Sequence, residues 1–203
     1  MKKNFVLGLL VLCSICFSNE QKTVIAKPGA ILELYDATTQ KVRPDIEDEP
    51  IAVVVDKGSQ FTHCNIIQNK EVARYRDQYL FKIWRGYVTI PADGNYVIAL
   101  SYNYYDKWGT RGPNNSHTIL EISGKTIMAI AQGQRSVGAM LDGRGSAGKL
   151  NATQNIRLQK GSYEFKIIHR SGVKNDVFTL KLWDKKRPLK KIFITPANMA
   201  HVE

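Results

Sequence analysis

The chain has 203 residues, of which 43% are hydrophobic and 23% are charged, with 15 glycines and 7 prolines. This composition excludes a collagen-like, low-complexity or wholly disordered chain. The 29 Lys and Arg residues outnumber the 18 Asp and Glu residues, which gives a net charge of +11. A basic protein meets anionic partners such as nucleic acid, anionic lipid or acidic glycan, and charge alone does not choose among them.

Residues 1–18 are predicted to be a secretory signal peptide. Lys2 and Lys3 precede an apolar run over residues 5–17, and the small residue Ser18 stands before polar Asn19. A short basic flank, an apolar run and a small residue at the cleavage site are typical of exported chains. The run is shorter than the roughly 20 residues of a membrane span. The alternative is an uncleaved anchor or a buried strand.

Export also determines what the cysteines can do. Cleavage after Ser18 would remove two of the three cysteines and leave Cys64, so no disulfide could form within the mature chain. We expect Cys64 to be a buried free thiol, with an intermolecular bridge as the alternative. No other segment is apolar enough to span a bilayer. The mature protein is therefore expected to be secreted or extracytoplasmic, in the periplasm or at the cell surface, without a transmembrane segment.

The rest of the chain consists of short apolar segments with a period of two, separated by turn signals such as Pro91-Ala-Asp-Gly94. A helical period is weak and confined to residues 70–80. The pattern predicts an all-β fold, a sandwich or barrel of mostly antiparallel strands. The predicted strands are, in chain order, residues 31–35, 51–55, 81–90, 96–102, 119–123, 126–130, 156–158, 163–167 and 177–183.

The order of several motifs resembles that of PA14-type domains. Residues 79–96 hold a Trp84-Arg-Gly86 strand, then the Pro-x-Asp-Gly turn, then Tyr96 at the start of the next strand. Later segments follow the order of that family: an opening strand, a display hairpin, a Leu-x-x-Gly-x-Tyr turn and a closing strand, at residues 32–35, 120–127, 158–163 and 180–183. The resemblance covers residues 29–185. It predicts a PA14-like β-sandwich there, between an N-terminal extension (19–28) and a basic C-terminal extension (186–203).

The resemblance implies a β-sandwich that binds carbohydrate or makes contacts in cell-surface and toxin assemblies. In the calcium-dependent lectins of the family, two consecutive aspartates bind calcium after the second of these strands. Here that place holds Asp106 alone, followed by Lys107. Calcium takes six to eight oxygen ligands, usually including several carboxylates. The sequence therefore does not support calcium, and no cofactor is predicted.

Signals for other chemistry are weak, and the chain is not expected to be an enzyme. The four histidines are isolated and no Cys-x-x-Cys spacing occurs, so no metal site is predicted. Residues 143–148 match G-x-G-x-x-G, but no helix pattern follows them, so they are interpreted as a loop. The acidic cluster at residues 45–49 is interpreted as a solvated loop or linker without a catalytic partner.

Two long polar or Gly-rich segments, residues 103–116 and 132–151, interrupt the strands. Loops of this length are often functional. The first contains a concentration of flat aromatic and hydrogen-bonding side chains, the combination that small-ligand sites use. The alternative is a strand extension that packs against a neighbouring sheet. The predicted ligand-binding residues are Asn103, Tyr104, Tyr105, Asp106, Lys107 and Trp108.

A second candidate is a basic patch near the C-terminus that would bind an anionic surface. Export argues against nucleic acid, and anionic surface glycans or lipopolysaccharide-like phosphates fit better. A solvated basic edge that discourages strand aggregation is the alternative. The patch consists of Lys185, Lys186, Arg187, Lys190 and Lys191.

Two functions from different classes follow. The first is a secreted or cell-surface module that recognises carbohydrate. The alternative is a structural or assembly subunit of a bacterial surface appendage or toxin complex, which would bind a protein of the same secretion or appendage system. Saturable binding to an immobilised glycan distinguishes the first function, and co-purification of a protein partner distinguishes the second.

Overall fold

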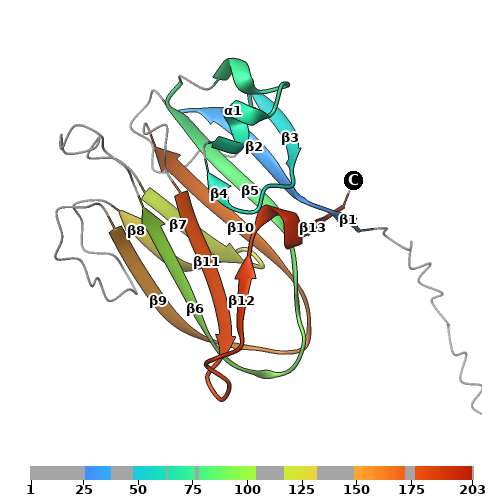
Figure 1. Cartoon of the computed structure of the whole chain (residues 1–203), viewed down its shortest axis with the longest axis vertical. Coiled ribbons are helices and arrows are strands. Elements are labelled where there is room, and N and C mark those ends of the chain that lie inside the picture. The colour runs from blue at the N-terminus through green and yellow to red at the C-terminus, as the bar shows by residue number, and fades with distance from the viewer. Residues whose placement is uncertain are drawn as a thin grey trace, which may run out of the picture.

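Two antiparallel sheets pack face to face (Figure 1). The computed structural model describes residues 26–37, 48–62, 64–75, 78–103, 117–131, 149–171 and 177–202. The predicted signal peptide lies outside these residues. All strand pairs among the described residues are antiparallel. The prediction of an all-β, mostly antiparallel sandwich is confirmed.

The larger sheet has eight strands among the described residues. Its main order is β1-β13-β5-β10-β7-β8, and β2 pairs with both β5 and β3. Strand β3 pairs only with β2 and β8 only with β7, so both lie at edges of the described sheet. The strands are β1 (Lys27–Pro28), β2 (Ala30–Asp36), β3 (Ala52–Asp56), β5 (Leu80–Ile90), β7 (His117–Ile122), β8 (Lys125–Ala131), β10 (Gly161–Ser171) and β13 (Ala200–His201).

The smaller sheet has five strands in the described part of the chain, in the order β12-β11-β6-β9, with β4 also paired to β11. Its strands are β4 (Phe61–Thr62), β6 (Gly94–Asn103), β9 (Lys149–Leu158), β11 (Val177–Asp184) and β12 (Lys191–Ile194). The weak helical period at residues 70–80 corresponds only to a 3-10 turn. The described helical segments are α1 (Cys64–Gln68) and the 3-10 turns Ala73–Tyr75 and Pro196–Asn198.

Strand periodicity explains the core. Alternate residues of β6 and β11 point inward and are buried, as the sequence pattern predicted, and those of β5 and β10 face them from the other sheet. Within the core the rings of Phe61 and Phe178 stack with centroids 4.8 Å apart. Trp84 meets both rings edge-on, at 5.5 and 5.4 Å. Each large aromatic buries apolar surface, and edge-on and stacked pairs add to that stabilisation.

Segments predicted to be extensions also contribute strands to the sheets. β1 pairs with β13, so the two described chain ends lie side by side (Figure 1). β12 pairs with β11. The close approach of the last segment to β5 depends on Gly86, since a Cβ there would lie 2.9 Å from the Ala200 carbonyl oxygen. This contact gives the Trp-x-Gly motif a packing role.

The two ends of the sandwich differ in the length of the connections between their strands. At the first, which we call the loop end, β6 ends at Asn103 beside the first residues of β9 and β11, Lys149 and Val177. The opposite end, which we call the hairpin end, carries the turns at residues 91–93 and 159–160 and the β11–β12 connection. The described residues that flank the two long segments noted in the sequence, Asn103, His117, Ala131 and Lys149, all lie at the loop end.

Candidate functional site

The predicted aromatic site begins at the loop end. Asn103 is the last residue of β6, and its backbone is paired with Lys149 on one side and Val177 on the other. Tyr104, Tyr105, Asp106, Lys107 and Trp108 lie outside the described residues, and the prediction that they bind a ligand remains a prediction.

A polar row lies inside the sandwich near the loop end. Lys82, His169 and Thr118 are cross-strand neighbours on β5, β10 and β7, and all three side chains are buried. The Thr118 hydroxyl and His169 Nδ1 are 2.8 Å apart, at hydrogen-bond distance. The His169 ring lies 5.2 Å from that of Phe178. Buried polar groups are normally hydrogen-bonded, and His169 follows this rule. Because the row spans three strands and its side chains are buried, we interpret it as structural.

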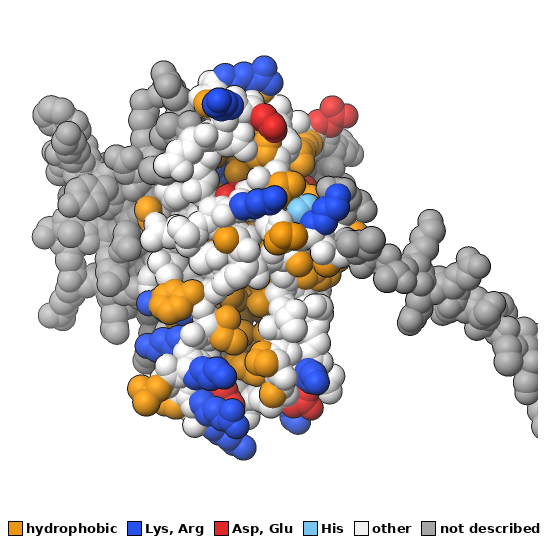
Figure 2. Space-filling model, turned by 45° about the vertical axis from the view of Figure 1, so that its right-hand side comes forward, with side chains coloured by type: hydrophobic (Ala, Val, Ile, Leu, Met, Phe, Trp, Pro, Cys, Tyr) orange, Lys and Arg blue, Asp and Glu red, His pale blue; other side chains and the backbone are white. Residues whose placement is uncertain are grey.

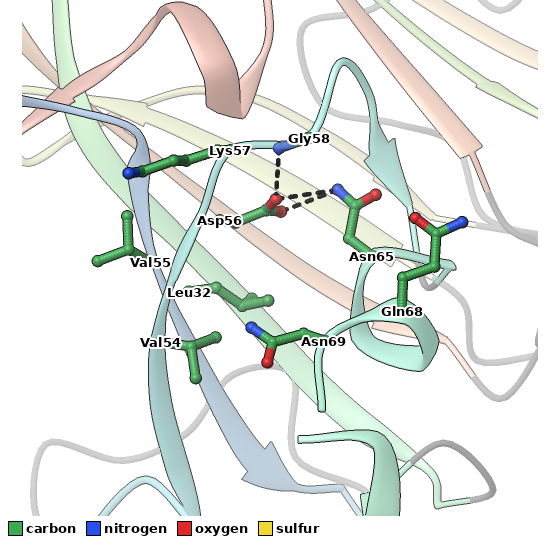
Figure 3. Close-up of a pocket in the computed structure, with 9 residues that line it drawn as sticks. All are labelled: Leu32, Val54, Val55, Asp56, Lys57, Gly58, Asn65, Gln68 and Asn69. Atoms are coloured by element: carbon green, nitrogen blue, oxygen red, sulfur yellow. Dashed lines mark hydrogen bonds between the residues drawn. The ribbon is translucent and has the colours of Figure 1, made fainter. Parts of the chain in front are cut away.

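A hollow of about 290 Å³ lies between edge strand β3 and helix α1 (Figure 3). Leu32 and Val54 form an apolar side, and amide side chains from α1 and the residue after it form the other. The hollow is small, close to the lower limit for ligand pockets. Its lining residues are Leu32, Val54, Val55, Asp56, Lys57, Gly58, Asn65, Gln68 and Asn69.

The one carboxylate in this hollow is Asp56, which is 6% exposed and fully engaged. One oxygen accepts the Gly58 backbone N–H at 2.8 Å, and the Asn65 amide donates to both oxygens at 3.1 and 3.0 Å (Figure 3). The other oxygen also accepts the Trp84 indole N–H at 2.7 Å. Asp56 therefore ties β3, α1 and the core tryptophan together.

Asp56 was not predicted from the sequence, although a local signal was present. Asp56 ends an apolar strand and stands two residues before Gly58, the spacing of an Asx turn. What the sequence did not reveal is the partner Trp84, which is distant in the chain. The predicted free thiol of Cys64 starts α1, but its side chain lies outside the described part of the structure.

A second hollow, of about 350 Å³, opens between the β7–β8 hairpin and edge strand β9. Its lining includes isoleucine and leucine side chains as well as the exposed Lys125 and Arg157, and none of the lining residues is acidic. The lining residues are Ile122, Ser123, Lys125, Thr126, Ile127, Gln154, Asn155, Ile156, Arg157, Leu158 and Tyr163.

Several charged groups on the outer face of the larger sheet have partners. Arg85 Nη2 lies 3.0 Å from Glu33 Oε2, and the Tyr35 hydroxyl donates to the same carboxylate oxygen at 3.0 Å. Burial, together with the hydrogen bond and the negative charge of Glu33, raises the pKa of Tyr35. The Arg170 guanidinium lies 5.0 Å from the Tyr79 ring, a cation–π contact. These groups stabilise the sheet face and suggest no catalytic chemistry.

The predicted basic patch is brought together by the β11–β12 connection. All five cationic side chains are exposed. The turn is held by backbone hydrogen bonds from Lys185 N to the Asn95 carbonyl at 2.9 Å and from Lys190 N to the Arg187 carbonyl at 3.1 Å. The Asp184 carboxylate accepts the backbone N–H of Lys186 at 2.9 Å. The patch is thus an ordered turn.

Two further candidates give no site in the described ranges. Among those residues, no three His, Cys, Asp or Glu side chains come together in a way that could hold a metal ion. No described helix has the length and apolar character needed to cross a membrane.

The sequence matches no family model and no curated protein. Among solved structures, the chain resembles an anti-sigma factor domain-containing protein with a TM-score of 0.54 and 15% identity, covering 90% of this chain and 50% of that one. It matches the PA14 sugar-binding domain of an RTX adhesin with a TM-score of 0.51 and 10% identity, covering 87% of this chain and 99% of that domain.

The chain also matches the PA14 domain of the antifreeze protein MpAFP, with a TM-score of 0.50 and 12% identity, covering 87% of this chain and 92% of that domain. It spans only 16% of the length of a β-glucosidase from Kluyveromyces marxianus that it also matches. At these identities the likeness concerns the fold alone. Because both PA14 domains are covered over nearly their whole length, the described β-sandwich has the PA14 fold.

Proposed function

We propose that this protein is a secreted or cell-surface module that binds carbohydrate at the loop end of its sandwich. The observation that carries the proposal is the fold match to an adhesin's PA14 sugar-binding domain, which extends over 99% of that domain. The residues proposed to contact the glycan are Asn103, Tyr104, Tyr105, Asp106, Lys107 and Trp108.

The chemistry of these residues suits a sugar. The C–H faces of a sugar ring stack on flat aromatic side chains such as Trp108, and amide, carboxylate and ammonium groups exchange hydrogen bonds with its hydroxyls. The described residues near the loop end give such a site a rigid base. The stacked rings of Phe61 and Phe178, with Trp84 edge-on, fix the strands from which the loop departs. A rigid base reduces the ordering cost of binding.

The proposed binding does not use calcium. Asp106 has no second aspartate beside it, and Lys107 follows instead. One carboxylate next to a cation does not provide the oxygen ligands that calcium requires. Treatment with a chelator should therefore leave glycan affinity unchanged, and loss of binding on chelation would show that a metal is needed.

The test is an immobilised-glycan array with mature protein, followed by titration with the best ligand. Trp108→Ala should weaken binding by about 1–3 kcal/mol, the effect of losing an aromatic anchor, with little change in melting temperature. Trp183→Ala, the same substitution on β11, is the matched control and should retain affinity. A large stability loss in Trp108→Ala without a ligand effect would assign Trp108 to packing. No glycan binding, together with a co-purifying protein, would favour an assembly subunit.

A further inference from the structure

The tip of the β11–β12 connection combines positive charge with an exposed apolar side chain. Leu189 is 97% exposed and is flanked in the chain by Pro188 and Lys190. Single exposed hydrophobic residues are ordinary on protein surfaces. What distinguishes Leu189 is its position at a projecting turn with cationic side chains on both sides. Figure 2 shows Lys and Arg side chains beside hydrophobic ones at this end of the molecule.

The cations at the tip are not neutralised within the described part of the chain. No ion pair joins any of the five to a described carboxylate. The nearest acid in the chain, Asp184, accepts the backbone N–H of Lys186. Asp93 on the neighbouring turn likewise accepts a backbone N–H, that of Lys160, at 2.6 Å. Unpaired exposed cations of this density attract an anionic surface.

Aromatic side chains lie on the outer face of the smaller sheet next to the tip. The Lys191 ammonium is 5.5 Å from the centre of the Trp183 ring. One row further along, Phe193 is 51% exposed and the Lys181 ammonium lies 5.1 Å from the centre of its ring. Aromatic rings beside cations suit the boundary between lipid headgroups and acyl chains, where one side of a group is apolar and the other is wet.

We propose that the β11–β12 connection docks reversibly on an anionic phospholipid surface. Its five cations would contact the headgroup phosphates, and Leu189 would insert between the acyl chains. An acidic polysaccharide or a nucleic acid would satisfy the charges, but neither offers an apolar phase for Leu189. Each cation near such a surface adds about fivefold to the partition coefficient, and burying one leucine side chain adds about tenfold or more. The proposal deepens the anionic-surface role of the patch and is independent of glycan binding.

Vesicle sedimentation with the mature chain tests the proposal. We expect binding to phosphatidylcholine vesicles that contain phosphatidylglycerol, little binding to pure phosphatidylcholine, and weaker binding as salt screens the charges. Replacing all five cations by Gln should reduce binding by at least about a hundredfold. Leu189→Ser should reduce binding by about tenfold at unchanged charge. Val53→Ser, at an exposed valine on β3, is the control for the leucine change.

Several outcomes would overturn the proposal. One is failure to bind anionic vesicles, and another is equal binding to neutral ones. If Leu189→Ser binds anionic vesicles as tightly as the unmodified protein does, the binding is purely electrostatic and the insertion of Leu189 is refuted. If a sulfated polysaccharide binds tightly while vesicles do not, the partner is a glycan. Trp108→Ala should bind vesicles normally, and the hairpin variants should bind glycan normally, so failure of one role does not affect the other. Unchanged melting temperatures confirm that the variants are folded.

Discussion

Replacing Asp56 should reveal how much of the fold depends on one buried carboxylate. In Asp56→Ala the indole N–H of Trp84, a residue with no exposed surface, loses its acceptor. A buried donor left without a partner costs about 1–3 kcal/mol. Gly58 also loses its acceptor, and Asn65 loses one of two, since its amide still donates to the Gln60 carbonyl at 2.7 Å. Both residues border the hollow, where water can replace the lost carboxylate in part.

The lost hydrogen bonds destabilise the fold, and removal of the desolvation cost of a buried carboxylate offsets part of this loss. We expect the free energy of unfolding to fall by about 3 kcal/mol in total. Urea denaturation followed by circular dichroism measures this loss. Glu71→Ala, at an exposed carboxylate, is the control and should cost under about 0.5 kcal/mol.

A double-mutant cycle separates the bond from other effects. Trp84→Phe removes the indole N–H, so in the Asp56→Ala background it should cost about 1–2 kcal/mol less than it does alone. An Asp56→Ala variant as stable as Glu71→Ala would refute the assignment of Asp56 as a structural anchor. Additive single effects would refute the direct coupling to the tryptophan.

Three further predictions follow from packing, burial and pKa. Gly86→Ala should destabilise the fold by about 1–3 kcal/mol, because its Cβ would lie 2.9 Å from the Ala200 carbonyl oxygen, and a melting curve unchanged from wild type would contradict this contact. Thr118→Val should cost about 1–2 kcal/mol by removing the partner of His169, whereas Thr118→Ser should retain most of the stability. Because the pKa of Tyr35 is raised in the folded state, its contribution is present below about pH 10 and falls as the pH rises further, so Tyr35→Phe should flatten the alkaline loss measured by urea unfolding.

The longer strands could be predicted because each has one face in a shared core. Phe178, Leu180 and Leu182 alternate with half-buried residues along β11, and the second half of β5 shows the same period, whereas residues 80–84 of β5 and 167–170 of β10 are buried on both faces of the sheet. The short strands could not be predicted in this way. β1 and β13 have two residues each, which is too short to show a period, and they form only because the two chain ends meet.

The candidate sites were predictable to different extents. The five cations of the β11–β12 connection lie within residues 185–191, so their clustering required no knowledge of the fold. The exposure of Leu189 was not predictable, because a single leucine can lie in the core or on the surface and no local sequence pattern distinguishes the two. Asp56 was missed because its main partner, Trp84, lies two strands away in the same sheet but 28 residues further along the chain, and such a hydrogen bond leaves no local pattern in the sequence.

The two proposed surfaces have a defined relation to each other. β11 begins at Val177 beside Asn103, where the proposed glycan-binding segment departs, and ends at Asp184, where the cationic hairpin begins. Its 8 residues, at about 3.3 Å each, separate the two ends by about 25 Å. A protein docked on a lipid surface through Leu189 would therefore hold its loop end away from that surface. In this arrangement one rigid sandwich can sit on a membrane and present its other end to glycans in the surrounding medium.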